Sequence, residues 1–457
     1  MKERILLFLI VLGLGVFIYI FQSYFNTVWG LAFLLICMAI YAGISTLAYK
    51  IKSRRLKKHP EPVNENYKPF VSIMIPAHNE EGVITETIEN VLALDYPNFE
   101  ILVIDDRSTD NTANVIKDLE KKYDKVTAFV RPKDAFPGKS AVLNDALPMT
   151  KGEAILVFDA DARVDKDFLT KLVPHLEPKD VGAVQARKVI RNANVNQLTR
   201  CQNNEMTMDT HLQVGRDSVR GAVELRGNGE LIKREALEDI HGWNNYTITD
   251  DLDMSTRLHI KGWDVRFSPD TIVYEEGIMY LIPLYRQRRR WLEGTIRRYL
   301  EYAGDVLTSR DMSLRVSLDL VAYISQFLMP AWFFMELFIR IFKIVIKDAP
   351  TNMIYSSLVI GAVIGFGFFC GARYSLRRYD NMPRGEAFVQ AIYTSIYLLM
   401  IWFPLVLFIG FKILFLKKDM NWGKTAHGLV QHEHAIQRAK EKIRQAKEEL
   451  KKLIRAK

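Results

Sequence analysis

The stretch Ala154-Ile-Leu-Val-Phe158, followed at once by Asp159-Ala-Asp161, indicates the fold class of this chain. A short unbroken apolar run is typical of a strand that is buried on both faces of a parallel sheet. Similar runs occupy residues 71–75, 99–104 and 126–130. The sequence therefore predicts several buried strands, and the last quoted one ends in a pair of acidic residues.

Segments with helical spacing of apolar residues separate these strands, at residues 81–94, 112–123 and 140–149. Strands that alternate with helices at this spacing form a mostly parallel sheet with helices on both faces. We therefore expect a Rossmann-like α/β domain over residues 70–280. Ligands of such sheets bind at the carboxyl ends of the strands, which is where the acidic clusters of this sequence lie.

Two uncharged apolar runs, residues 5–25 and 28–49, open the chain. Each has about 20 residues, the length that crosses a hydrocarbon core of about 30 Å. A cleaved signal peptide is the alternative for the first run, but its length and the second run behind it disfavour this. Six basic residues follow the second run: Lys50, Lys52, Arg54, Arg55, Lys57 and Lys58. Since short basic loops stay in the cytoplasm, the long polar middle of the chain is expected there.

Further membrane segments are expected at residues 316–346, 354–372 and 387–416. Asp319, Glu336 and Arg340 interrupt the first, which predicts a surface position or a protein-lined cavity for them. Pro404 in the third predicts a kink or a re-entrant segment. Three full spans would place the C-terminus outside, whereas its basic residues favour the inside. We therefore expect one of these segments not to cross simply.

The predicted organisation has six parts. They are two transmembrane helices (1–50), a basic linker (51–69), the α/β domain (70–280), amphipathic interface helices (281–312), C-terminal transmembrane or re-entrant helices (313–418) and a basic helical tail (419–457). The tail is expected to be a solvated helix near anionic lipid, and a coiled coil that binds a partner is the alternative.

The chain has 457 residues, a formal net charge of +9 and a hydrophobic share of 49%. Its positive residues follow the edges of the apolar segments, which disfavours nucleic-acid binding. The three cysteines, Cys37, Cys201 and Cys370, have the spacing of neither a metal site nor a disulfide framework. This pattern predicts a reducing compartment and disfavours redox chemistry.

The turns behind the first strands contain candidate ligand-binding residues. Pro76-Ala-His-Asn-Glu80 would receive a nucleoside, with a helix cap by Asn79 or Glu80 as the alternative. Asp105-Asp106 follows the second strand, where Ser108 or Asp110 could cap the next helix. Two adjacent acids exceed what capping needs, so we favour a functional role for them. Gly138-Lys-Ser140 resembles the end of a P-loop, but Lys133 stands where that motif has glycine, so we reject a P-loop. Lys139 is instead expected to meet a diphosphate as a point charge.

Two acidic clusters farther along predict the chemistry. Asp159 and Asp161 flank one residue, and two such carboxylates can hold Mg²⁺ together with phosphate oxygens and water. Thr249-Asp-Asp251-Leu-Asp253 precedes a helical pattern, so one of its acids is expected to cap that helix. We predict that Asp251 is the general base for an acceptor hydroxyl.

The segment Gln287-Arg-Arg-Arg-Trp291 lies on an amphipathic stretch that leads to the membrane. Its arginines could simply meet lipid phosphates. A tryptophan beside arginines also suits sugar stacking and diphosphate contact, which is the function we predict.

In these motifs the chain resembles membrane-bound family 2 glycosyltransferases, the group of cellulose, hyaluronan and poly-N-acetylglucosamine synthases. The similarity covers residues 70–300 and rests on Asp106, Asp159/Asp161, Thr249-Asp250-Asp251 and Gln287/Arg290/Trp291. Asp250 stands where the family often has glutamate, and the presumed base is unaffected by this difference. The resemblance implies a GT-A fold, a UDP-sugar donor, Mg²⁺ or Mn²⁺, and inversion to a β-linkage.

The resemblance also implies roles for single residues. Asp106 and Asp159 would contact the nucleotide and Asp161 the metal, while Gln287, Arg290 and Trp291 would close over donor and acceptor. The full set expected to bind the nucleotide-sugar is Pro76, Ala77, Asn79, Glu80, Asp106, Lys139, Asp159, Gln287, Arg290 and Trp291. The acceptor-site candidates are Asp250, Trp291, Gly227 and Asn228.

Several stretches are most similar to glycolipid-forming members such as cyanobacterial β-monoglucosyldiacylglycerol synthase. They are residues 225–230, 249–253, 275–277, 290–294, 298–300 and 421–427. This similarity implies a bacterial cell-membrane enzyme that moves a sugar, glucose first of all, from a UDP-sugar to a lipid such as diacylglycerol. The alternative is a processive polysaccharide synthase that also translocates its product. A non-catalytic scaffold is disfavoured by the intact set of acids.

Overall fold

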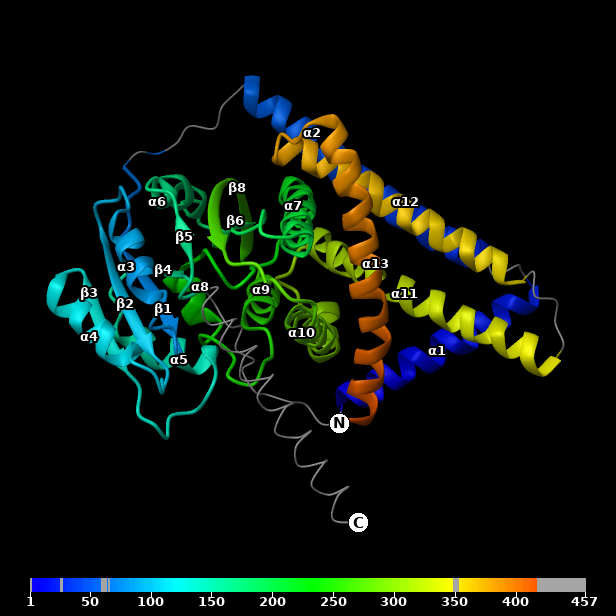
Figure 1. Ribbon diagram of the computed structural model, residues 1–457, viewed down its shortest axis with the longest axis horizontal. Helices are drawn as coiled ribbons and strands as arrows, with labels where there is room; N and C mark the ends of the chain where they lie inside the picture. The colour runs from blue at the N-terminus through cyan, green and yellow to red at the C-terminus, as the bar shows by residue number, and fades with distance from the viewer. Residues whose placement is uncertain (1, 25–27, 59–63, 65, 348–352, 417–457) are drawn as a thin grey trace, which may run out of the picture.

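The computed structural model describes residues 2–24, 28–58, 64, 66–347 and 353–416. The predicted helical tail and residues 59–63 and 65 of the predicted linker lie outside these residues. Residues 51–58 of that linker belong to the second helix, Val28–Lys58. Figure 1 shows an α/β domain on one side of the molecule and long helices, from both ends of the described chain, on the other. The expected placement of an α/β domain between N- and C-terminal apolar helices is confirmed.

The α/β domain is built on one eight-stranded sheet with the strand order β3-β2-β1-β4-β7-β6-β8-β5. Its strands are β1 (Val71–Ala77), β2 (Phe99–Asp105), β3 (Val126–Val130), β4 (Ala154–Val157), β5 (Arg163–Val164), β6 (Val181–Ile190), β7 (Glu230–Lys233) and β8 (Asp264–Glu275). The first four are parallel, as predicted. β7 runs antiparallel to β4 and β6, so the second half of the sheet is mixed.

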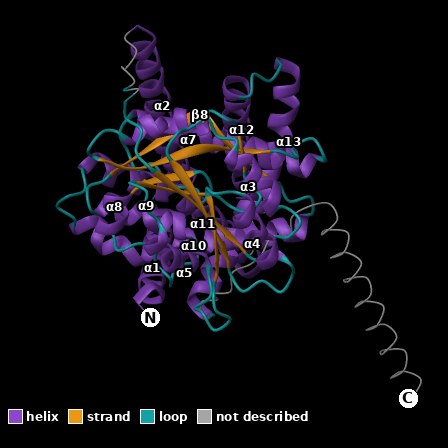
Figure 2. Ribbon diagram, turned by 90° about the vertical axis from the view of Figure 1, so that its left-hand side faces the viewer, coloured by secondary structure: helices purple, strands orange, loops and turns teal. Residues whose placement is uncertain are grey.

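Helices cover both faces of the sheet, and Figure 2 shows them enclosing it. Ile73 and Ile75 of β1 point to one helical layer and Met74 to the other. Because successive side chains of a strand face opposite ways, a strand covered on both sides has to be apolar throughout. The first layer contains α3 (Ile84–Leu92), α4 (Thr112–Lys122) and α6 (Phe168–Leu172); the second contains α5 (Lys139–Ala146), α8 (Arg234–Asp239) and α9 (Asp250–Ile260).

The described chain has seven longer helices. One of them, α7 (Gln197–Ser218), lies within the α/β domain, and α10 (Leu281–Thr308) follows the domain in the chain. The other five are α1 (Lys2–Tyr24), α2 (Val28–Lys58), α11 (Leu314–Lys347), α12 (Met353–Tyr379) and α13 (Arg384–Phe415). Among the described residues, the segments of α1, α2, α12 and α13 are long and apolar enough to cross a membrane. The chain is therefore a membrane-associated protein.

The long helices do not all run the same way. α1, α2, α11 and α12 extend away from the α/β domain, whereas α13 runs across them close to the domain (Figure 1). α13 contacts α7 and α10 on one side and α1, α11 and α12 on the other. The expectation that one C-terminal segment does not simply cross the membrane stays a prediction. The direction of α13 fits this expectation best.

The three charges predicted to interrupt the first C-terminal segment are all buried in α11. Glu336 forms an ion pair with Arg340, one turn later on the same helix. Asp319 accepts hydrogen bonds from the Tyr41 hydroxyl (2.7 Å), from Arg216 Nε of the α/β domain (2.7 Å) and from the Ala222 amide (2.9 Å). These charges therefore bind protein groups, and Asp319 joins α11 to the α/β domain.

Candidate active site

The carboxyl ends of β1, β2 and β4 lie side by side, because β1 pairs in parallel with both neighbours. Ala77 lies opposite Asp105 of β2, and Met74 lies opposite Val157 of β4. The loops that follow these strands therefore start at one edge of the sheet. This edge is the place where the strand alternation predicted a ligand site.

The loops after β1 and β2 are fastened together by side chains. Asn79, with a left-handed φ of 55°, accepts a hydrogen bond at Oδ1 from the Thr109 amide (2.6 Å). The Glu80 amide donates to Thr112 Oγ1 (2.8 Å). Pro76 and Ala77 are the last, buried residues of β1. Of these four predicted nucleoside-binding residues, two end β1 and two hold the following loop against the loop after β2. Their contact with a nucleoside stays a prediction.

Asp106 is fully buried between two arginines. Its Oδ1 accepts from Arg131 Nη1 at 2.5 Å and from Arg107 Nε at 2.8 Å. Arg131 also donates to Asp145. A buried carboxylate is retained where it is paired, so these arginines stabilise Asp106 in its place. Arg131 was missed by the sequence analysis, although its position directly after β3 was a usable signal.

Lys139 brings three predicted site residues together. Its Nζ donates to Asp159 Oδ1 (2.7 Å) and to the Gly227 carbonyl (2.6 Å). The Asp159 amide donates to Asn228 Oδ1 (3.2 Å). Burial opposes the charge of Lys139, but Asp159 and the nearby Asp250 outweigh it and raise the pKa of the ammonium group. Lys139 therefore stays charged inside this acidic cluster.

Asp161 is buried, and its Oδ2 accepts from the Glu276 amide (3.2 Å) at the end of β8. Among the described residues, no group of three His, Cys, Asp or Glu side chains is placed to hold a metal ion. Mg²⁺, however, is commonly bound by one or two carboxylates and completed by water and substrate phosphates. Asp159 and Asp161 fit such a site, in which the phosphates of a ligand supply the remaining oxygens.

Asp251 lies in the first turn of α9, which begins at Asp250 with Thr249 as its N-cap. Its Oδ1 accepts from the Leu252 amide (2.9 Å). Gly227 has a φ of 77°, and a Cβ there would come within 3.3 Å of Asp251 Oδ2. Burial, together with the neighbouring Asp250, raises the pKa of Asp251 to about 6. A carboxylate with a pKa just below neutral is suited to accept a proton at physiological pH.

Glu230, the first residue of β7, is a member of this cluster that the sequence analysis did not assign. Its side chain is fully buried, and among the described residues neither carboxyl oxygen has a hydrogen-bond partner. Burial raises the pKa of Glu230 to about 8; Lys139 lowers it, while Asp250, Asp251 and Asp159 raise it. Glu230 is therefore largely protonated at neutral pH.

We expect Glu230→Gln to make the protein's stability less dependent on pH. Between its ordinary pKa of 4.5 and about 8, native Glu230 holds a proton that the unfolded chain has lost. The free energy of unfolding therefore falls as pH rises through this range, and glutamine removes that loss. Melting temperatures measured in detergent from about pH 5 to about pH 8 should fall less for Glu230→Gln than for the unmodified protein.

Glu224→Gln is the matched control, with the opposite sign. Glu224 is equally buried, and although burial opposes its charge, Arg298, Arg216 and Arg226 lower the pKa of its carboxyl group. Its contribution to stability is therefore present above its ordinary pKa, and glutamine should destabilise the protein at neutral pH. A Glu230→Gln variant whose melting temperature falls with pH as steeply as that of the parent would contradict the assignment.

The Gln287–Trp291 motif lies on α10, and its best-anchored residue is Arg288. Arg288 is fully buried, pairs with Glu205 Oε2 of α7 (2.7 Å) and stacks over the Trp291 ring (4.1 Å). Gln287 accepts a hydrogen bond from Arg288. Tyr397 and Trp402 of α13 donate to the same Glu205 (2.9 and 2.8 Å). Glu205 thus fastens α7, α10 and α13 together, and both it and Arg288 were missed from the sequence.

Trp291 is linked to the acidic cluster through Lys188 of β6. Lys188 Nζ lies 5.7 Å from the centre of the Trp291 ring and donates to the Arg226 carbonyl (3.3 Å), next to Gly227. Arg290 is half-buried on the same helix. The structure thus brings Lys139, Asp159, Gly227, Asn228 and Asp251 together. Lys188 lies between this group and Trp291. A direct contact of Gln287 and Arg290 with this group stays a prediction.

Comparison with known proteins places this arrangement in context. A family model described as "Glycosyltransferase like family 2" matches residues 69–294. The β-monoglucosyldiacylglycerol synthase of Trichormus variabilis is 36% identical over 412 residues, which are 87% of this chain and 84% of that protein. The enzyme of the same name from Synechocystis sp. is 36% identical over 373 residues, covering 79% and 75%.

A more distant relative shares less of the chain. The poly-β-1,6-N-acetyl-D-glucosamine synthase of Staphylococcus epidermidis is 29% identical over 269 residues, 58% of this chain and 64% of that one. Among solved structures, the mannosyltransferase PcManGT of Pyrobaculum calidifontis, in complex with GDP-Man and Mn²⁺, matches with a TM-score of 0.56 at 20% identity. The match covers 80% of this chain and 99% of that one. It confirms the expected GT-A fold.

Proposed function

Since this chain belongs to glycosyltransferase family 2, we propose that it transfers glucose from UDP-glucose to the hydroxyl group of diacylglycerol. The two relatives that are 36% identical over most of the chain both have names that describe this product. The alternative, a processive polysaccharide synthase, is supported by relatives that match a smaller share of the chain.

The observation that carries the proposal is the pair of groups on either side of Gly227. Lys139 Nζ binds the Gly227 carbonyl, and Asp251 Oδ2 lies 3.3 Å from the position of a Cβ on the same residue. A cation for a departing diphosphate and a base for an attacking hydroxyl are thus separated by a residue that has no side chain. Sugar transfer needs both groups around one small space.

The proposed reaction is a single displacement. The acceptor hydroxyl oxygen attacks the anomeric carbon, the bond from that carbon to the UDP oxygen breaks, and Asp251 takes the hydroxyl proton. Attack from the side opposite the leaving group inverts the anomeric carbon to a β-linkage. Lys139 offsets the charge of the diphosphate, and Asp106 with Arg107 and Arg131 fixes the nucleotide end of the site.

Asp159 and Asp161 would hold the divalent cation, Mg²⁺ or Mn²⁺, that the resemblance implies. When bound, such a cation stabilises negative charge on the leaving diphosphate. The Glu276 amide orients Asp161, and Lys139 orients Asp159. These two contacts set the directions of the carboxylates before a ligand arrives.

A lipid acceptor would reach the site from the membrane side of α10. Leu281 and Ile282, in the first turn of that helix, are 57% and 67% exposed. Such apolar side chains at the start of an amphipathic helix suit the membrane interface. Trp291, Asp250, Gly227 and Asn228 are the proposed acceptor contacts. The α/β domain lies on the cytoplasmic side in this proposal, and the basic ends of α2 and α12 support this orientation.

The test is a transfer assay on the full chain reconstituted with diacylglycerol, Mg²⁺ and radiolabelled UDP-glucose. We expect label in the organic phase, dependent on diacylglycerol and lost when the cation is chelated. UDP-N-acetylglucosamine and GDP-mannose serve as donor controls. Label that remains aqueous in long chains would instead make the protein a polysaccharide synthase, and absence of label from every donor would contradict the proposed activity.

A further inference from the structure

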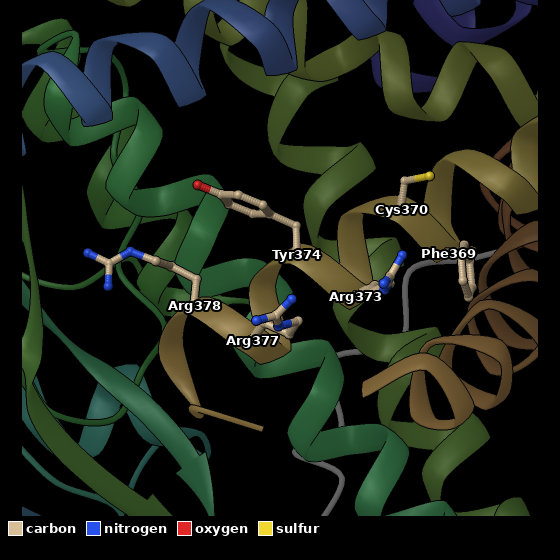
Figure 3. Close-up of a pocket in the computed structure, with 6 residues that line it drawn as sticks. All are labelled: Phe369, Cys370, Arg373, Tyr374, Arg377 and Arg378. Atoms are coloured by element: carbon tan, nitrogen blue, oxygen red, sulfur yellow. The ribbon is translucent and has the colours of Figure 1, made fainter. Parts of the chain in front are cut away.

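A second polar site lies away from the active site, between the ends of α2 and α12. A cavity of about 520 Å³ is lined by Arg373, Arg377, Arg378 and Tyr374, together with Phe369 and Cys370, and Figure 3 shows these side chains on consecutive turns of α12. An adjoining cavity of about 290 Å³ shares Tyr374 and Arg378 and adds Lys50 and Arg54 of α2. We call these two cavities together the basic pocket.

The basic pocket has five cations and no described carboxylate partner for any of them. Within the described chain, Lys50, Arg54, Arg373, Arg377 and Arg378 form no ion pair with an acid. Two acids near these helix ends are already bound: Asp380, two residues after Arg378, pairs with Arg187, and Asp217 of α7 pairs with Lys52 of α2 and with Arg266. The positive charge of the pocket is therefore available to an anion from outside the protein.

The walls of the pocket are ordered by contacts between its own residues. Arg378 donates to the Tyr49 hydroxyl and lies over the rings of Tyr49 (5.5 Å) and Tyr379 (5.8 Å). Lys50 Nζ lies 5.9 Å from the centre of the Tyr374 ring. Stacking on aromatic faces leaves guanidinium and ammonium N–H groups directed elsewhere, where they can bind an anion.

His211 of α7 contacts Tyr374 of the pocket and the neighbouring Tyr379. Its ring lies 5.0 Å from the Tyr374 ring, and its Nδ1 is 3.2 Å from the Tyr379 hydroxyl. Burial, then Arg378 and Lys50, lower the pKa of His211 to about 4. The imidazole is therefore neutral at physiological pH, and the positive potential of the pocket comes from its lysine and arginines.

The position of the pocket selects one source of anions. It lies where the apolar segments of α2 and α12 end and both helices contact α7 of the α/β domain. Figure 1 shows these two helices side by side as they approach the domain. Tyrosine and arginine at such helix ends occur at the depth of lipid headgroups. The segment after α13 is rich in lysine and arginine, so it is a poor partner for this cluster.

We propose that the basic pocket binds the phosphate of an anionic phospholipid headgroup from the surrounding bilayer. Arginine binds phosphate through two parallel N–H groups, and three arginines of α12 are available to do so. The apolar surface of α12 that precedes Arg373 would lie along the acyl chains. This site is separate from the sugar-transfer site, and it does not depend on which acceptor the enzyme uses.

The test is native mass spectrometry of the full chain in detergent, titrated with phosphatidylglycerol or with phosphatidylcholine of the same acyl chains. We expect saturable binding of phosphatidylglycerol. The double substitution Arg373→Gln/Arg377→Gln should weaken it roughly 30-fold, since two basic residues near an anionic lipid contribute about 1 kcal/mol each. Arg373→Lys/Arg377→Lys, which keeps the charges but not the paired N–H groups, should bind more tightly than the glutamine variant and less tightly than the parent, and it checks that the site still folds.

The matched control is Arg55→Gln/Lys57→Gln, which removes the same charge from exposed residues near the same end of α2 but outside the pocket. It should leave phosphatidylglycerol binding nearly unchanged. Equal losses in the two double variants would show diffuse attraction to basic helix ends and overturn the site. Displacement of the lipid by millimolar inorganic phosphate, or equal binding of phosphatidylcholine, would likewise overturn an anionic-lipid site.

Discussion

Asp251→Asn should lower sugar transfer by roughly 10²- to 10⁴-fold, the usual contribution of a general base, while the protein stays folded. Asparagine preserves the shape of the side chain and can still accept from the Leu252 amide, but it cannot take the acceptor's proton. UDP-glucose binding, measured by calorimetry on the same preparation, should change little. The loss is therefore expected in kcat rather than in donor affinity.

The pH profile of the unmodified enzyme gives an independent check. Because burial and Asp250 raise the pKa of Asp251 to about 6, the reactive carboxylate is lost as pH falls through this value. Activity should therefore decline on the acid side near pH 6, and the residual activity of Asp251→Asn should lack this limb.

Asp264→Asn is the matched control for Asp251→Asn. Burial also raises the pKa of Asp264 to about 6, but it lies at the start of β8, beside Arg266. The Asp264→Asn variant should retain transfer activity and should still lose activity as pH falls through about 6. If Asp251→Asn keeps more than a tenth of the activity, or if Asp264→Asn loses as much, the assignment of Asp251 as the base fails.

Arg216→Met should destabilise the protein by roughly 3–5 kcal/mol, the effect of removing one partner from a buried ion pair. Arg216 is fully buried, and its Nε donates to Asp319 of α11 at 2.7 Å. It also lies 3.3 Å from Glu224 and 4.4 Å from the Tyr323 ring. Methionine fills much of the volume but leaves Asp319 charged and with fewer partners in a site that excludes water.

The measurement is thermal or denaturant unfolding of the purified protein in one detergent. Adding Asp319→Leu to Arg216→Met should recover part of the lost stability, because the uncompensated charge is then gone. Arg220→Met is the matched control: its pair with Asp180 is about half exposed, and its loss should cost less than about 1 kcal/mol. A destabilisation by Arg216→Met no larger than that of Arg220→Met would contradict the conclusion that the Arg216–Asp319 ion pair holds α11 to the α/β domain.

The sequence by itself determined the strands and the acids at their ends. Residues 71–75, 99–104, 126–130 and 154–158 were predicted as strands, and each becomes one of the four parallel strands of the sheet. Both signals are local. A strand covered on both faces must be apolar over its whole length, and a parallel sheet brings the carboxyl ends of its strands to one edge.

Local pattern also predicted helix boundaries well, with differences that have local causes. The helix predicted at 81–94 begins at Ile84, because the Val83 and Ile84 amides first bind the Glu80 carbonyl. The helix predicted at 140–149 ends at Ala146 and continues as a 3₁₀ turn, Leu147–Met149, that contains Pro148. Proline lacks the amide hydrogen that would extend the α-helical ladder.

Only the tertiary structure decided which charged and polar side chains meet. Arg131 comes to Asp106, Arg216 to Asp319, and Arg378 to Tyr49, across 25, 103 and 329 residues of sequence. The burial of Glu230 beside Asp250 and Asp251 is decided in the same way. Hydrophobic periodicity fixes which face of an element is buried, but not which element packs against it. Ion pairing and pKa shifts depend on that packing. Interactions between charges weaken over a few ångströms, and burial removes the water around each charge.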